Sequence, residues 1–173
     1  RLLRHLNPSL LIAIERCGLT KHNDYRNMRG VNMTNYNARI DHMFDLHENS
    51  IGIGDGGNEI GMGNLSKLIP NLPLPSPINE PCITKTANLV VSTVSNWGGY
   101  GLIAALSILY GKNLLPNIES EQNVLKKCVE YGAVDGVSTL NEYTVDGLSI
   151  KEHNRILLEL REYVETKILV GEK

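Results

Sequence analysis

Gly52-Ile-Gly-Asp-Gly-Gly-Asn-Glu-Ile-Gly-Met-Gly63 is the stretch that decides how this chain folds, and it holds six of the sixteen glycines among 173 residues. Glycine loses more backbone freedom on folding than any other residue, so this density indicates left-handed backbone or close approach of bare main chain. Ile51–Ile53 predicts a short buried strand. We expect a helix to begin within the run and to end before Pro70, which would make an anion-binding turn of backbone amides.

Two further apolar runs predict strands around this one. Leu10–Ile14 is continuous in apolar residues, which is typical of a strand buried on both faces. Leu89–Val94 predicts a third strand. Residues 133–138 predict another short strand. Because these strands alternate with helical segments, we expect a three-layer α/β fold, with a mostly parallel sheet and helices on both faces, as in Rossmann-like proteins. The length fits a single domain over residues 1–173.

The helical segments are identified by their periodicity and their end signals. A helix over 35–47 places Tyr36, Ile40, Met43, Phe44 and His47 on one face. Four other segments are expected to be helical: the end of a helix over 1–6, an apolar and therefore buried helix over 95–110, an amphipathic helix over 120–131, and a last helix that opens with the capping box Ser149-x-x-Glu152.

Composition excludes several classes of function. The 17 Lys and Arg residues against 19 Asp and Glu give a net charge of −2, which argues against a nucleic-acid partner. Three dispersed cysteines, Cys17, Cys82 and Cys128, favour neither a disulfide framework nor a metal clip. No apolar run approaches the ~18 residues of a membrane span, and no signal or transit peptide is visible. We therefore expect an intracellular, soluble protein without membrane contact.

Polar side chains follow each of the three main predicted strands. Ligands of parallel sheets bind beyond the carboxyl ends of the strands, so these side chains are expected to gather at one edge. Structural alternatives exist: ion pairs at the rim, a tight turn, or a helix cap beside a packed tryptophan. The candidates are Glu15 and Arg16 after the first strand, Asp55, Gly56, Gly57, Asn58 and Glu59 after the second, and Ser95, Asn96 and Trp97 after the third.

Some of the same residues match, in part, the patterns of cofactor-binding sites. Gly52-x-Gly54-x-x-Gly57 formally matches the dinucleotide fingerprint, but its first glycine lies inside the strand and a proline-rich loop replaces the expected acidic residue. No GxxxxGK[ST] phosphate loop is present. A hard cation such as Mg or Mn suits carboxylate oxygens, although no metal ligand is assigned. The carboxylates that could hold one are Glu15, Asp55, Glu59 and Asp135, the last of which also fits a simple Asp-Gly turn.

Two blocks, Gly54–Asn64 and Val94–Tyr100, resemble the signature blocks of the D-glutamate cyclase C-terminal domain family. The resemblance covers nearly the whole chain. Because family members usually have a longer N-terminal portion, it implies that the chain is the C-terminal part of a longer domain. Other similar stretches are Ile12–Arg16, Met28–Gly30 with Asp41, Gly132–Gly136, and Val145–Leu148 with His153.

The resemblance implies a carbon–oxygen lyase that closes D-glutamate to 5-oxo-D-proline and water. It also implies a mitochondrial location in a eukaryote or a cytoplasmic one in a bacterium, and it leaves self-association into a homo-oligomer open. Such chemistry needs a clamp for the α-carboxylate, a base for the ammonium, and an acid or oxyanion donors at the γ-carboxyl.

The candidates can be matched to those roles as a hypothesis. Arg16 suits the clamp, and Asp55 or Glu59, with Glu15 beside them, suits the base or acid. The remaining candidates would bind substrate: the amides of Gly56 and Gly57 with Asn58 and Asn96 as oxyanion donors, and Ser95 and Trp97 as readers of chirality.

Two other functions fit the same residues. One is a non-catalytic module that binds an amino acid or a phosphorylated metabolite. The other is a Mg-dependent enzyme acting on phosphate esters. The first predicts binding without product, and the second predicts loss of activity with a chelator.

Overall fold

The computed structural model describes residues 2–74 and 77–171. By their internal contacts, the residues group into two compact units, Arg1–Gly98 and Gly99–Lys173. The single domain expected over 1–173 stays a prediction.

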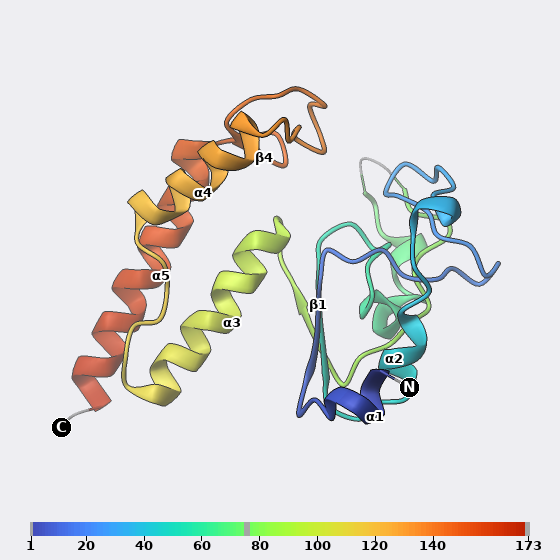
Figure 1. The fold of residues 1–173 in the computed structure, drawn as a ribbon, viewed down its shortest axis with the longest axis horizontal. Helices are drawn as coiled ribbons and strands as arrows, with labels where there is room; N and C mark the ends of the chain where they lie inside the picture. Colours follow the sequence, from blue (N-terminus) through green and yellow to red (C-terminus); the bar gives the residue numbers. More distant parts are fainter. Residues whose placement is uncertain (1, 75–76, 172–173) are drawn as a thin grey trace. The chain divides into compact units, whose positions relative to one another are not determined.

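The first unit is built on a parallel three-stranded sheet (Figure 1). The strands β1 (Leu11–Ile14), β2 (Ser50–Gly54) and β3 (Asn88–Val91) lie in the order β1-β2-β3. The register pairs Ile14 with Ile53 and Gly54 with Val91, so the strands end at a common edge. The α/β fold expected from the sequence, a parallel sheet with helices packing around it, is confirmed.

One face of the sheet packs against helix α2 (Asp41–Asp45) and the returning part of the glycine run. Ala13, Phe44 and Ile60 form a buried cluster there. The other face is covered over Ile53, which is fully buried, but Ile12 and Ile14 are 47% and 53% exposed. The expectation that Leu10–Ile14 is buried on both faces is therefore wrong, because an apolar run alone does not specify which of its faces is covered.

The helix expected over 35–47 is shorter than its periodicity suggests. A 3₁₀ turn, η1 (Thr34–Tyr36), precedes α2, and Asn37 between them is extended. The guanidinium of Arg16 donates to Asn37 Oδ1 and to the Ala38 carbonyl, which a continuous helix would need for its own ladder. Tyr36 is consequently 86% exposed rather than part of an apolar face.

The glycine run does not continue into an α-helix, contrary to expectation. Gly57 and Gly61 have φ of 96° and 103°, which a right-handed helix cannot accommodate. The run instead doubles back onto the end of β1, where Gly18 N–H donates to Asn58 O at 2.8 Å and Ile60 N–H to Arg16 O at 2.7 Å. Two 3₁₀ turns follow it, η2 (Met62–Leu65) and η3 (Ile69–Asn71), and Pro70 lies within the second of them. The predicted anion site at a helix N-terminus is therefore wrong.

Helix α3 (Ser95–Tyr110) begins in the first unit and continues in the second. Its bounds match the expected 95–110. The expectation that this helix is buried is wrong near the end of the helix, where Leu109 is 81% exposed. The short helix α1 (Leu2–Leu6) lies where the sequence predicted a helix end.

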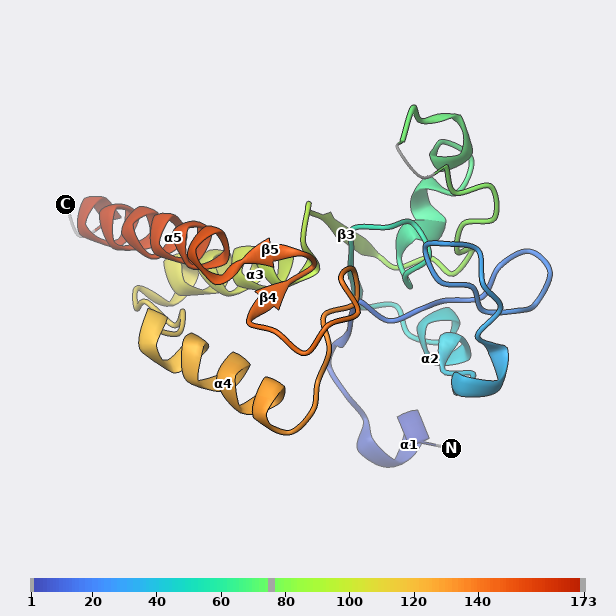
Figure 2. The ribbon, with the colours of Figure 1, turned by 90° about the horizontal axis from the view of Figure 1, so that it is seen from above.

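The second unit also contains α4 (Ile118–Glu130), the ribbon of β4 (Thr144–Val145) and β5 (Leu148–Ser149), and α5 (Ile150–Gly171) (Figure 2). The predicted capping box is confirmed, since Ser149 N–H donates to Glu152 Oε2 at 3.1 Å and Glu152 N–H to Ser149 Oγ at 3.3 Å. The strand predicted over 133–138 is wrong. That segment forms turns around Asp135, whose carboxylate binds the local amides that a strand would offer to a neighbour.

Gly52 supplies a test of the packing beneath the glycine run. A Cβ at this position would lie 2.7 Å from Gly61 Cα and in contact with the Ile60 carbonyl, both of them backbone atoms. We expect Gly52→Ala to destabilise the chain by about 2 kcal/mol or more in urea unfolding, as overpacked cores do. The control Gly101→Ala, on α3 with no atom within 4 Å of the new Cβ, should be neutral or stabilising by up to about 1 kcal/mol. Equal unfolding midpoints for the two variants would contradict this packing.

Candidate active site

Three predicted acidic residues meet at the carboxyl edge of the sheet. One carboxylate oxygen from each of Glu15, Asp55 and Glu59 lies within 4.8 Å of the others. Glu15 follows β1, Asp55 follows β2, and Glu59 comes from the returning glycine run. Glu15 is exposed, Asp55 half-buried and Glu59 only 1% exposed, so this carboxylate trio grades from solvent to interior. The expected gathering of these three side chains is confirmed.

Glu15 is held in an unusual backbone conformation. Its φ is 52°, in the left-handed region that costs a non-glycine residue roughly 1–2 kcal/mol. Its N–H still donates to Ile53 O at 3.0 Å, so the residue remains tied to β2. Strain of this kind persists only where the surroundings enforce it, and it concentrates at functional sites.

Glu59 is bound by the two glycine amides that precede it. Gly56 N–H donates to Oε1 at 2.9 Å and Gly57 N–H to Oε2 at 2.8 Å. Burial raises the pKa of Glu59, the nearby Asp55 charge adds to the rise, and the amide donors oppose it. The expectation that these amides bind a substrate oxyanion needs correction, because they bind the chain's own carboxylate.

Asp55 is oriented by the start of α3. Its Oδ2 accepts from both the backbone N–H and the hydroxyl of Ser95, each at 3.0 Å. A carboxylate at a helix N-terminus is stabilised by the helix dipole. Asn96 and Trp97, exposed and half-buried respectively, lie in the same first turn. Ser95 therefore positions Asp55, whereas substrate contacts of Ser95, Asn96 and Trp97 stay predictions.

Arg16 and Asn58 organise the loops beside the trio. Besides its bonds to Asn37 and Ala38, the Arg16 guanidinium lies 6.0 Å from the centre of the Tyr25 ring. The Asn58 side chain hydrogen-bonds to Cys17, a thiol whose pKa is raised by burial. These contacts give both residues a structural role, and their binding of substrate stays a prediction.

A buried carboxylate that the sequence did not single out as functional holds together the segments next to the candidate site. Asp41, 1% exposed on α2, accepts hydrogen bonds from Leu19 N–H at 2.9 Å, Thr84 Oγ1 at 2.6 Å and the Tyr25 hydroxyl. It thus joins the loop after β1, which holds Leu19 and Tyr25, to the segment of Thr84 that precedes β3. The sequence did not indicate this role, because it does not show which hydrogen-bond donors from other segments bind Asp41.

Asp135, proposed as a fourth metal ligand, lies in the second unit and serves its own loop. Its oxygens accept from Val137, Ser138 and Gly147 amides and from the Thr144 hydroxyl, at 2.8–2.9 Å. Burial acts to raise its pKa, but these hydrogen bonds outweigh it and lower the pKa to about 2. This set of partners supports the turn predicted from Asp135-Gly136 rather than a role with the trio.

The trio has the donor chemistry of a divalent-cation site. Three carboxylates at this spacing suit Mg²⁺ or Mn²⁺, which prefer oxygen ligands. The same arrangement without a cation places a buried acid, Glu59, beside two carboxylates that lie nearer to solvent.

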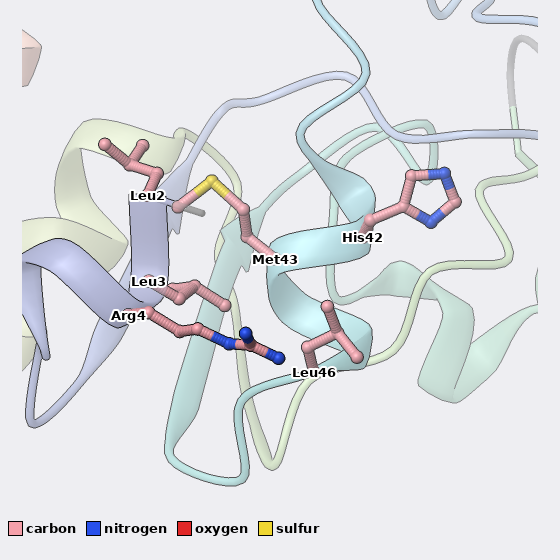
Figure 3. Close-up of a pocket in the computed structure, with 6 residues that line it drawn as sticks. All are labelled: Leu2, Leu3, Arg4, His42, Met43 and Leu46. Atoms are coloured by element: carbon pink, nitrogen blue, oxygen red, sulfur yellow. The ribbon is translucent and has the colours of Figure 1, made fainter.

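A groove in the first unit lies away from the carboxylate trio. A groove of about 490 Å³ lies between α1 and α2 and is mainly apolar in its lining (Figure 3). Leu2, Leu3 and Met43 gather there, whereas the imidazole of His42 points away. The groove adjoins α1, which precedes β1, while the trio follows the strand ends. It is therefore separate from the candidate site.

Across residues 2–74 and 77–171, no helix is both long and apolar enough to cross a membrane. The compartment, the partners and the oligomeric state stay predictions.

Comparison with known proteins agrees with the resemblance in the glycine run. The family model described as D-glutamate cyclase-like, C-terminal, matches residues 3–161. The human protein "D-glutamate cyclase, mitochondrial" is 31% identical over a match that covers 80% of this chain and 27% of the human protein. The chain therefore spans about a quarter of that relative's length.

The matched residues contain all three carboxylates of the trio, both glycines that bind Glu59 and the Ser95 that binds Asp55. The chain belongs to the D-glutamate cyclase-like, C-terminal family.

Proposed function

We propose that the chain is the site-bearing part of a D-glutamate cyclase-like lyase, which converts D-glutamate to 5-oxo-D-proline and water. The observation that supports it most is the carboxylate trio, because two of its members, Asp55 and Glu59, lie in the glycine run and the third ends β1 beside it. The membership of the family and the name of the human relative agree with this assignment.

The reaction needs proton transfers at two different places. The α-ammonium must lose one proton before its nitrogen attacks the γ-carboxyl carbon, and the nitrogen must lose a second proton as the lactam forms. The oxygen that leaves the γ-carbon must gain two protons to depart as water. A C–N bond forms and a C–O bond breaks, with no change in oxidation state. The site therefore needs a base and an acid in reach of one another.

Glu59 and Asp55 suit these two roles because their surroundings differ. Burial raises the pKa of Glu59, so this side chain retains a proton at higher pH than an exposed glutamate and can act as the acid. Asp55 is half-buried and oriented by Ser95, so it can accept the ammonium proton. Glu15, nearest to solvent, can attract the ammonium before that step.

Positioning of the substrate would supply a further part of the rate acceleration. The nucleophile and the carbonyl carbon belong to one molecule, so holding the substrate in a ring-like pose removes much of the entropic barrier. A Mg²⁺ or Mn²⁺ ion held by the trio would polarise the γ-carboxyl, and we include it in the proposal as an alternative to acid catalysis by Glu59.

Asp55→Asn tests the assignment of the base. The Asn oxygen can still accept from Ser95, so the fold should remain, while turnover of D-glutamate should fall at least ~100-fold because general-base catalysis contributes about 10²–10⁴. The measurement is 5-oxoproline formation from D- and L-glutamate, with and without a chelator. The control is Asp45→Asn, an exposed residue of α2.

Unchanged turnover in Asp55→Asn would contradict the assignment. Loss of wild-type activity with chelator would select the cation form of the proposal. Binding of D-glutamate without product in the wild type would indicate a binding module instead.

The raised pKa of Glu59 predicts a pH-dependent stability. The folded pKa lies above the ordinary value of 4.5, so protonated Glu59 stabilises the fold fully below that value, and this contribution is lost as pH rises through the folded pKa. Glu59→Gln cannot titrate and turns one N–H donor toward the glycine amides. The free energy of unfolding of the wild type minus that of Glu59→Gln should therefore decrease from acid to neutral pH in urea titrations. A difference that grows over this range would refute the direction of the shift.

A further inference from the structure

A polar pocket of about 170 Å³ lies between two loops of the first unit. One wall is formed by residues 26–30 and the other by 77–80. Its charged lining residues are Arg26, Arg29 and Glu80, so the pocket carries both signs of charge. A pocket of this kind suits a small zwitterion better than a polyanion such as a phosphate ester.

The pocket borders the glycine run that holds Glu59. Met28 Cβ lies 3.6 Å from the position that a Cβ on Gly56 would take, and Ile78 Cδ1 lies 3.2 Å from the corresponding position on Gly57. Met28 and Ile78 both line the pocket. A ligand in the pocket would therefore contact Met28 and Ile78, the two side chains that approach the glycines whose amides bind Glu59.

Two of the charged residues already have strong ionic partners. Arg26 pairs with Asp24 at 2.9 Å, and Glu80 pairs with Lys21 at 3.3 Å and His22 at 3.2 Å. Arg29 is exposed at the tip of a turn. A guanidinium has five N–H donors, so Arg29 can bind a ligand carboxylate with its planar fork while also holding a protein acceptor.

We propose that this pocket binds the α-carboxylate of a free amino-acid substrate, with Arg29 as its binding residue. The inference rests on the proposed function, since cyclisation places the γ-carboxyl at the trio and leaves the α-carboxylate to be bound nearby. It also differs from the role expected of Arg16, whose guanidinium is engaged by Asn37 and Ala38.

Steady-state kinetics of Arg29→Gln test the pocket with two ligands. One is D-glutamate, and the other is 4-aminobutyrate, which lacks the α-carboxylate and is added as a competing ligand. We expect KM for D-glutamate to rise about 10–100-fold, as loss of a charge-assisted hydrogen bond implies. The kcat should change less than about threefold, and Ki for 4-aminobutyrate should stay the same. Arg155→Gln, an exposed residue of α5 in the second unit, is the matched control and should change none of these.

The possible outcomes distinguish failure of the pocket assignment from failure of the proposed function. An unchanged KM in Arg29→Gln, with an active wild type, overturns the pocket assignment and leaves the cyclase proposal intact. A parallel rise of KM and Ki also overturns it, because that pattern indicates a structural role. A wild type that neither converts nor binds D-glutamate overturns the proposed function, and the pocket assignment with it.

Discussion

The carboxylate of Glu59, held by the amides of Gly56 and Gly57, is the interaction on which the site depends. It forces the chain to turn sharply after β2, and the left-handed Gly57 makes that turn attainable. The turn sends the run back across the sheet, where Gly52 and Gly61 allow the two backbones to touch. The same turn buries Glu59 next to Asp55, and this burial raises the pKa of Glu59.

A second buried acid fixes the surroundings of this turn. Asp41 binds an amide and a tyrosine hydroxyl of the loop after β1 and a threonine hydroxyl of the segment before β3. An unpaired buried carboxylate would be far more costly than this satisfied one. The loops it joins run to Tyr25 and Thr84, close in sequence to the two walls of the polar pocket. The two buried carboxylates thus differ in their partners, since Asp41 joins two segments of the chain and Glu59 binds amides of its own turn.

The sequence was enough to predict that the trio lies at one edge of the sheet, but not the backbone path that brings Glu59 there. The apolar strands and the polar residues after them were enough to predict a common edge, because parallel strands end together. The helix expected after Gly54 was wrong because two glycines adopt positive φ, and a pattern of residue types does not contain backbone angles. The helix over 35–47 failed for a related reason, since Arg16, a residue remote in sequence, takes the carbonyl that the helix required.

Those failures share a physical cause, which is competition from partners far along the chain. Local periodicity describes α4 and α5 well, where the hydrogen bonds are internal to each helix. At the site, each decisive hydrogen bond joins a loop to another segment or to its own buried side chain. The glycine density signalled unusual backbone, but only the three-dimensional arrangement identifies the anion that the backbone binds.

A crystal structure of the protein with 5-oxo-D-proline bound would show directly whether the product lies at the carboxylate trio. We expect the lactam within hydrogen-bond distance of Asp55 and Glu59, with the Gly56 and Gly57 amides still bound to the Glu59 carboxyl group. A product held by those two amides, with Glu59 displaced from them, or a product bound away from the trio, would contradict this expectation.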